Sequence, residues 1–247
     1  MLTDAGTAAA ASSQRRKGKV AVIIPTFNEA AAIGDVVAAL PRDIVDRIIV
    51  ADGGSSDGTA DIARRAGAEL LAVGKGYGHA CLAGAQAADD ADIVIFMDGD
   101  GADDPAYIND MVAAMRSGRY DFVIGSRVRG EREAGSIAGH QILAGLAAGA
   151  LIKLCYGVRY TDMCAYRAIR RDTLLALGMR ERTYGWNLEM QMRVARAGLH
   201  ILELPVAYRR RAGGESKVAG NLRGSIKAGS RILATFVRVA MEPMRGG

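Results

Sequence analysis

The chain has 247 residues, 50% apolar and 24% charged, so it can bury a substantial core and is too apolar for a disordered protein. It has only three cysteines, Cys81, Cys155 and Cys164, and they lack metal-ligand spacing, which suits a reducing, cytosolic setting with no disulfide framework. The net charge of +5 is concentrated in residues 206–247, where nine Lys or Arg face two Glu. A basic end on a near-neutral body indicates an anionic partner, such as a nucleotide, a phosphate or a membrane surface.

Residues 1–18 are expected to form a disordered tail, because their charges follow the small residues, the reverse of a secretory signal. Strands and helices then alternate. Strands are expected at 19–25, 47–52, 68–73, 92–98 and 121–126, and helices at 28–40, 55–67 and 76–89. This order is typical of an α/β domain with a mostly parallel central sheet and helices on both faces. The longest uncharged apolar stretch, residues 141–152, is too short to span a membrane.

Polar residues follow four of the predicted strands, and ligands of such sheets bind outside the carboxyl ends of the strands. These residues are Thr26, Asn28 and Glu29 after the first strand, Asp52 after the second, Asp98 and Asp100 after the fourth, and Ser126 and Arg127 after the fifth. Helix capping is the alternative interpretation for Asn28, Asp57 and Asp104. Capping can explain any one of these residues, but it explains less well why polar residues follow four different strands.

Asp98 and Asp100 flank Gly99 directly after an apolar strand. Two carboxylates so close repel each other, and a hard cation that prefers oxygen ligands would relieve the repulsion. Such a cation could also neutralise a diphosphate leaving group. A solvated acidic turn is the alternative, since a bare D-x-D occurs by chance in many chains.

Several motifs together make the chain similar to a family 2 glycosyltransferase of the GT-A fold, over about residues 20–227. They are "IPTFNEA", "VADGGSSDGTADIA", "GKGYGHACLAG", "MDGDGADDP", "DFVIGSRVRG" and "GGESKVAG". The sequence most resembles the dolichol-phosphate mannosyltransferase-like branch, including its short bacterial members. The D-x-D of that branch usually reads Asp-Ala-Asp, so Gly99 is a mild departure.

The resemblance implies roles for residues along the first half of the chain. Nucleotide-binding roles fall on Pro25, Thr26, Asn28, Glu29, Asp52, Lys75, Gly76, Asp98 and Gly99. Asp98 and Asp100 would hold Mg²⁺ or Mn²⁺ against the diphosphate, and Asp100 would thereby serve catalysis. The Gly-rich loop with a basic residue that nucleotidyltransferases carry after the first strand is missing, which argues against sugar-nucleotide synthesis.

The resemblance places the acceptor in the second half of the chain. The candidates for contact with the phosphates of donor or acceptor are Arg127, Arg209, Arg210, Arg211, Ser216 and Lys217. An ordinary solvated basic face is the alternative, favoured for Arg129, Arg132 and Arg210. Trp186 stacks on a sugar or acceptor in one interpretation and packs in the core in the other.

Glu189, in a helix expected at 184–198, is the candidate base if the acceptor is a hydroxyl, and an ion pair with Arg193 is the alternative. An ionised phosphate acceptor needs no base.

The expected function is inverting transfer of a hexose from a UDP- or GDP-sugar to a lipid acceptor, with a polyprenyl phosphate as the favoured acceptor. The alternatives are a hydroxyl acceptor or, in another class, a non-catalytic nucleotide-sugar-binding module. The few aromatic residues (5%) argue against nucleic acid as a partner. A homo-oligomer stays open.

Residues 19–218 are expected to form the catalytic domain, and residues 219–247 a basic amphipathic helix. Ile226, Leu233, Phe236, Val237 and Ala240 fall near one stripe of that helix, with Ile232 beside it, and Lys227, Arg231 and Arg238 lie on or beside the other face. Such a helix can lie on the inner face of the plasma membrane, and the protein would then be cytoplasmic and peripheral. Packing of the stripe on the domain or on a second subunit is the alternative.

Overall fold

A computed structural model describes residues 18–212 and 222–243, with the backbone alone for 222–229. Residues 1–17 of the predicted tail, and Ser216 and Lys217, lie outside the described residues. Seven strands form one sheet in the order β3-β2-β1-β4-β6-β5-β7. They are β1 (Val20–Thr26), β2 (Arg47–Asp52), β3 (Glu69–Ala72), β4 (Ile93–Phe96), β5 (Phe122–Ser126), β6 (Arg167–Arg170) and β7 (Ile201–Pro205). Only β6 runs antiparallel to its neighbours, so the sheet is mostly parallel, as predicted.

The centre of the sheet consists of continuous apolar runs. Every residue of β1 and β4 is buried, which is typical of parallel strands covered on both faces. Strand β1 pairs with β2 on one side and with β4 on the other, and Thr26 stands opposite Asp52 in the first of these pairs. The carboxyl ends of β1 and β2 therefore place these two polar side chains next to each other.

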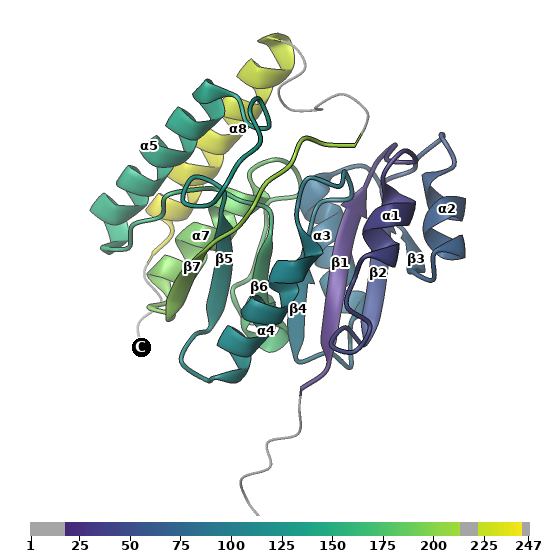
Figure 1. Cartoon of the computed structure of the whole chain (residues 1–247). Coiled ribbons are helices and arrows are strands. Elements are labelled where there is room, and N and C mark those ends of the chain that lie inside the picture. Colours follow the sequence, from purple (N-terminus) through teal and green to yellow (C-terminus); the bar gives the residue numbers. More distant parts are fainter. Residues whose placement is uncertain (1–17, 213–221, 244–247) are drawn as a thin grey trace, which may run out of the picture.

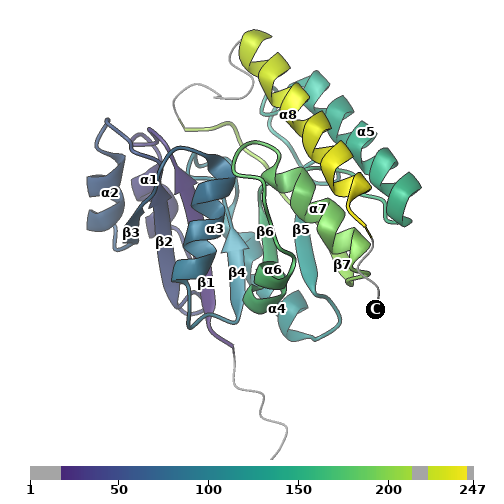
Figure 2. The ribbon, with the colours of Figure 1, turned by 180° about the vertical axis from the view of Figure 1, so that it is seen from behind.

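Helices cover both faces of the sheet, with α1 and α4 on one face and α3 and α7 on the other (Figures 1 and 2). The helices are α1 (Ile33–Ala38), α2 (Thr59–Arg65), α3 (Tyr77–Ala87), α4 (Ile108–Arg116) after a 3₁₀ turn at Pro105–Tyr107, α5 (Gly139–Tyr156), α6 (Arg171–Ala176), α7 (Trp186–Arg196) and α8 (Leu222–Met241). Helices α5 and α8 both contact α7 and lie at one end of the molecule.

The first helix differs from its prediction. It begins at Ile33 and not at Asn28, whose backbone is left-handed with a φ of 56°. Asparagine tolerates this conformation better than most residues, so the chain turns at Asn28 before the helix starts. Asn28 therefore does not cap α1.

The apolar stretch at 141–152 lies within α5. Small residues let this helix lie close to the segment around Tyr160 of the same chain: a Cβ at Gly149 would lie 2.0 Å from the carbonyl oxygen of Tyr160. Its buried side consists of Gly145, Ala148, Gly149 and Ile152. No helix of the described part of the chain is long and apolar enough to cross a membrane.

Candidate active site

The predicted polar residues of β1 and β2 form a hydrogen-bonded rim at the carboxyl end of the sheet. The Thr26 hydroxyl donates to Asp52 Oδ1 (3.1 Å), and the amides of Gly54 and Ser55 donate to Asp52 Oδ2 (3.1 and 2.9 Å). Buried Asp52 is thus held by Thr26 of β1 and by the loop that follows β2. We call residues 25–29, 52–59 and 98–104 the strand rim.

Two loops of the strand rim are bonded to each other. The amide of Asn28 donates to Ser55 Oγ (2.8 Å), while Asn28 Oδ1 accepts from the amide of Ser56 (2.9 Å). The Asp57 carboxylate accepts from the amides of Thr59 and Ala30, but the N-cap position of α2 is Gly58, so Asp57 is not the helix cap that the alternative interpretation expected. These bonds fix the shape of the rim.

The loop after β4, residues 98–104, which we call the acidic loop, brings the carboxylates of Asp98, Asp100 and Asp103 close together. Tyr77 of α3 donates its hydroxyl to Asp98 Oδ1 (3.3 Å), and Asp103 Oδ2 accepts from the amide of Asp98 (3.2 Å). Burial and the neighbouring Asp100 raise the pKa of Asp98 to about 6. Burial and the charge of Asp98 also raise the pKa of Asp103. Burial and mutual repulsion therefore disfavour the ionised forms of these carboxylates.

Gly99 fits a close approach between the acidic loop and β1. A Cβ at this position would lie 2.9 Å from Thr26 Cγ2 and 3.2 Å from Ile24 Cγ2. The departure from Asp-Ala-Asp thus has a packing reason in this chain. Asp104, in contrast, accepts from the amide of Ala106 and caps the 3₁₀ turn that begins at Pro105, as the capping interpretation expected.

The segment 207–212, which follows β7, lies along the acidic loop. The amide of Arg209 donates to the carbonyl of Ala102, and the amide of Ala212 donates to the carbonyl of Asp100, both at 2.9 Å. Two ion pairs join the same two segments, one between Arg209 and Asp104 (2.8 Å) and one between Arg211 and Asp100 (2.5 Å). These predicted phosphate ligands therefore contact the D-x-D loop itself.

Arg127 binds a carboxylate that the sequence did not single out. Its Nε and Nη2 donate to the two oxygens of Asp162, both at 2.8 Å, and its guanidinium lies 4.9 Å from the centre of the Tyr208 ring. A phosphate ligand would have to share Arg127 with Asp162. Arg210 lies further out and binds Glu133 and the carbonyl of Ala134. We call Arg127, Arg209, Arg210 and Arg211 the arginine flank.

Lys75 and Gly76 precede α3 at the edge of the rim. The Lys75 ammonium lies 5.2 Å from the centre of the Phe27 ring, directly after β1. Gly76 has a φ of 134°, and a Cβ there would lie 2.6 Å from the carbonyl oxygen of Arg182. The structure thus brings Lys75 to the end of β1, whereas Gly76 is packed against the loop before α7.

Glu189 is fully buried, and both of its carboxylate oxygens are occupied. Arg193 (2.9 Å) and Arg238 of α8 (3.0 Å) pair with Oε1, while the amides of Arg180 and Glu181 donate to Oε2. The i, i+4 ion pair of the alternative interpretation is present. The role as a base stays a prediction, and these contacts favour a structural role.

Trp186 is fully buried and packs edge-to-face on Phe96, with the ring centres 6.2 Å apart. Of the two interpretations offered by the sequence, the structure has the core packing. The indole therefore has no exposed face for a sugar in this conformation.

The donor set of the acidic loop suits a divalent cation. No group of three or more His, Cys, Asp or Glu among the described residues is arranged to hold a metal. Two carboxylates, Asp98 and Asp100, do fit an ion that keeps waters and phosphate oxygens as its other ligands. Asp103 Oδ1 is buried and has no hydrogen-bond partner within residues 18–212 and 222–243, and the guanidinium of Arg211 pairs with Asp100. The site thus already binds positive charge.

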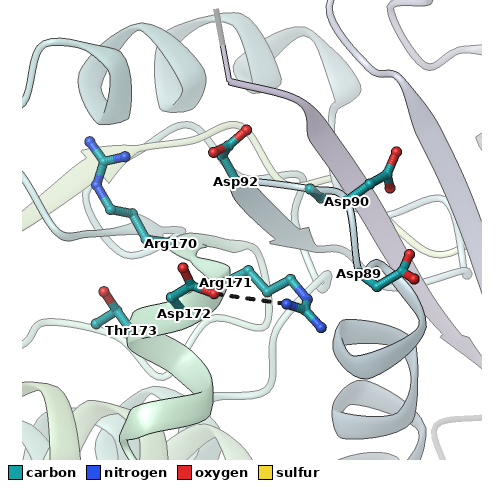
Figure 3. A pocket seen from close by; sticks show the side chains of 8 residues that line it. Asp89, Asp90, Asp92, Arg170, Arg171, Asp172 and Thr173 are labelled. Carbon is teal, nitrogen blue, oxygen red and sulfur yellow. Dashed lines mark ion pairs between the residues drawn. The ribbon is translucent and has the colours of Figure 1, made fainter. Parts of the chain in front are cut away.

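Two hollows lie elsewhere on the surface. One, of about 250 Å³, is at the amino ends of the parallel strands and is lined by Asp89, Asp90, Asp92, Arg170 and Arg171 among others (Figure 3). It contains no predicted site residue, and Arg47 already pairs with Asp89 and Asp90. The other, of about 220 Å³, adjoins the arginine flank and is lined by Glu131, Arg132, Glu133, Ala207, Tyr208 and Arg209.

Several residues of the site were missed in the sequence. They are Ser55, Tyr77, Asp103, Asp162 and Tyr208. Ser55 and Tyr77 belong to quoted motifs, and Asp103 to the quoted acidic run, so their positions carried a signal. Nothing in the local sequence links Asp162 to Arg127, because the pair is 35 residues apart and meets only through the sheet.

Comparison with known proteins identifies the architecture. Residues 21–178 match the model of the family described as "Glycosyl transferase family 2". An uncharacterized glycosyltransferase of Mycobacterium tuberculosis is 36% identical, over 85% of this chain and 94% of the relative. An undecaprenyl-phosphate mannosyltransferase of Micrococcus luteus is 34% identical (83% and 90%), and a dolichyl-phosphate hexose transferase of Haloferax volcanii is 33% identical (90% and 94%).

Solved structures share the fold. Glucosyl-3-phosphoglycerate synthase from Mycobacterium tuberculosis, in complex with Mn²⁺, UDP-glucose and phosphoglyceric acid, superimposes with a TM-score of 0.70 and 23% identity. The match covers 92% of this chain and 81% of that one. The same synthase with Mg²⁺ and UDP gives a TM-score of 0.71. The chain therefore has the GT-A fold that the sequence predicted.

Proposed function

Because this chain belongs to glycosyl transferase family 2, we propose that it transfers a hexose, with inversion, from a UDP- or GDP-sugar to a polyprenyl phosphate. An acceptor phosphate oxygen attacks the anomeric carbon while the bond from that carbon to the diphosphate breaks. An ionised phosphate has no proton to lose, so this reaction needs no general base. The observation that carries the proposal is the acidic loop at the end of β4, with which two arginines of the arginine flank, Arg209 and Arg211, form ion pairs.

The strand rim supports the donor half of the proposal. Asp52 and the backbone groups of residues 26–29 would bind the nucleoside, with Lys75 at the edge of the same pocket. Asp98 and Asp100 would hold Mg²⁺ or Mn²⁺, which supplies positive charge for the diphosphate that departs. The glucosyl-3-phosphoglycerate synthase structures contain Mn²⁺ or Mg²⁺ together with a uridine nucleotide.

The acceptor half rests on the arginine flank and on the names of relatives. Two relatives above 30% identity are named for transfer to undecaprenyl phosphate or dolichyl phosphate. Arg209, whose side chain is 56% exposed, lines the hollow of about 220 Å³ and offers its guanidinium to a phosphate that enters from this side. Guanidinium groups suit phosphate because they bind it in a bidentate way.

A second candidate acceptor is a small soluble molecule with a hydroxyl group. The support for it is the likeness in fold to a synthase crystallised with phosphoglyceric acid. This reaction must remove a proton from the acceptor, and Glu189 is the carboxylate proposed for it. Its contacts with Arg193 and Arg238 make this the weaker of the two proposals.

An apolar outer surface supports a lipid acceptor. Helix α5 exposes Leu143 (68%), Leu146, Leu151 and Leu154 (83%), and α8 exposes Leu233, Val237 and Met241 (78%). We call these seven residues the apolar face, and we propose that it contacts the membrane surface on which the acceptor lies. Ile232 and Phe236 of α8 instead pack against the core, while Arg231 and Arg238 pair with Glu181 and Glu189. Of the stripe expected from the sequence, Leu233 and Val237 are exposed and Phe236 is turned to the core, while the side chain of Ile226 lies outside the described residues. A second copy of the chain is the alternative cover of the exposed residues.

A matrix of donors and acceptors tests the proposal. UDP- and GDP-hexoses are incubated with a polyprenyl phosphate, the matching polyprenol or 3-phosphoglycerate, each with Mn²⁺, with Mg²⁺ or with EDTA. Release of nucleoside diphosphate that requires both the polyprenyl phosphate and the metal supports the proposal. Turnover with the polyprenol or with 3-phosphoglycerate alone favours the hydroxyl acceptor. Absence of metal-dependent release with every donor contradicts both.

A further inference from the structure

The guanidinium of Arg211 lies on Oδ2 of Asp100, one of the two carboxylates proposed to hold the metal. We propose that Arg211 is a resident counter-cation of the D-x-D loop, so that a metal ion binds only by displacing it from Asp100. This inference rests on the proposed metal role of Asp98 and Asp100. It adds that the affinity for metal is set by a residue from segment 207–212, 111 positions along the chain from Asp100.

The geometry at Asp100 leaves little room for two cations. Nε and Nη2 of Arg211 both donate to Asp100 Oδ2 (3.1 and 2.5 Å), and Oδ1 accepts from the amide of Ala102 (2.9 Å). The side chain of Asp100 is 4% exposed and that of Arg211 is 30% exposed. A metal ligated by Oδ2 therefore competes directly with the forked guanidinium.

The carboxylates around the pair explain why a cation is favoured there. Asp98, Asp100 and Asp103 belong to one loop, in which Asp103 Oδ2 accepts from the amide of Asp98 (3.2 Å) and Arg211 pairs with Asp100. A buried group of acids without positive charge would be costly, and Arg211 offsets part of that cost. A divalent ion can take over this task, because it brings a larger charge to the same carboxylates.

Two backbone hydrogen bonds hold Arg211 in place. The amides of Arg209 and Ala212 donate to carbonyls of the acidic loop, so the residues on both sides of Arg211 are attached to that loop. Arg211 Nη1 is buried and has no hydrogen-bond partner among the described residues. The guanidinium thus has one donor left over, which a phosphate oxygen could accept once the metal has displaced it from Asp100.

Direct measurement of Mn²⁺ binding, by electron paramagnetic resonance of free Mn²⁺ without any nucleotide, tests the exchange. We expect Arg211→Ala to bind Mn²⁺ about tenfold more tightly than the wild-type chain, or about 1.4 kcal/mol. Arg211→Lys keeps the charge but loses the fork, so its affinity should lie between the two. Arg209→Ala is the matched control, because it removes a similar ion pair from the same segment at Asp104, outside the D-x-D.

The outcomes distinguish two claims: the exchange, in which a metal ion displaces Arg211 from Asp100, and the assignment of Asp98 and Asp100 as metal ligands. Asp100→Asn must weaken Mn²⁺ binding if the assignment is right, whatever Arg211 does. If Asp100→Asn weakens binding but Arg211→Ala leaves it unchanged or weaker, the exchange is wrong and the assignment survives. Equal tightening by Arg209→Ala and Arg211→Ala would show a general effect of charge and would also overturn the exchange. Thermal unfolding of each variant confirms that it is folded, and Arg211→Lys decides if Arg211→Ala is not.

Discussion

The strand rim and the arginine flank are built by different means, although Arg209 and Arg211 of the flank contact the acidic loop of the rim. In the rim, Asp52, Asn28 and Asp57 are held by backbone amides and hydroxyls of adjacent loops. In the flank, Arg127, Arg209 and Arg211 are held by single carboxylates that come from distant parts of the chain. The rim is therefore preformed, whereas the flank consists of ion pairs whose carboxylates can be released to another cation.

The largest effect is expected at the acid that both regions share. Asp100→Asn should lower hexose transfer by about 10²- to 10³-fold, because it removes one of the two carboxylates proposed to hold the metal. The loss of one group from a charge-stabilising site typically costs that much. Steady-state turnover at limiting Mn²⁺ measures it. Asp104→Asn is the control, since Asp104 caps a turn and pairs with Arg209, and it should lose far less. Wild-type turnover of Asp100→Asn would remove the D-x-D from the mechanism.

A substitution of Glu189 tests whether this residue is a general base or a structural partner of Arg193 and Arg238. Glu189→Gln should lower the free energy of unfolding by about 2 kcal/mol, because it removes the buried carboxylate that Arg193 and Arg238 share, although both arginines keep their pairing with Glu242. Thermal or denaturant unfolding measures this, with transfer per folded molecule recorded alongside. A variant of normal stability that binds nucleotide but transfers nothing would instead establish the base and favour a hydroxyl acceptor.

The apolar face extends the comparison to the lipid side of the molecule. Leu143→Glu together with Leu154→Glu should weaken binding to vesicles by at least about tenfold, since burial of one leucine contributes about 1.5–3 kcal/mol. Co-sedimentation with anionic vesicles at low and high salt measures it. Leu175→Glu is the control, because Leu175 is an exposed leucine of α6, outside the apolar face.

If wild type and the double variant bind vesicles equally, or neither binds, the membrane proposal is wrong. A change in oligomeric state on sedimentation would then point to a second copy of the chain. Deletion of α8 is a poorer test, because it also removes Arg238 from Glu189 and the buried Val239 from the core.

The smallest effect is expected within the rim. Gly99→Ala places a Cβ 2.9 Å from Thr26 Cγ2, and such overpacking typically costs about 1–2 kcal/mol. The variant should melt earlier and bind donor slightly less well, because the acidic loop must shift away from β1. An unchanged melting temperature would mean that the rim is less rigid than its hydrogen bonds indicate.

The sequence by itself determined the order of the first strands and the polar ends that they carry. Continuous apolar runs such as 20–24 and 93–96 can only be buried strands or helices, and short length with turn residues on both sides favoured strands. In a parallel sheet the carboxyl ends meet at one edge, so the amino-acid sequence alone was enough to place Thr26, Asp52 and Asp98 together.

Only the tertiary structure decided which charges meet. Arg127 with Asp162, Arg211 with Asp100 and Glu189 with Arg238 are pairs between residues 35, 111 and 49 positions apart, and no local pattern encodes them. The same holds for β6, a four-residue strand that enters the sheet antiparallel between β4 and β5, and for the side of α8 that faces outward. A helix has a fixed period, but the neighbour against which it packs selects the stripe that is buried, and that neighbour, α7, is supplied by the fold.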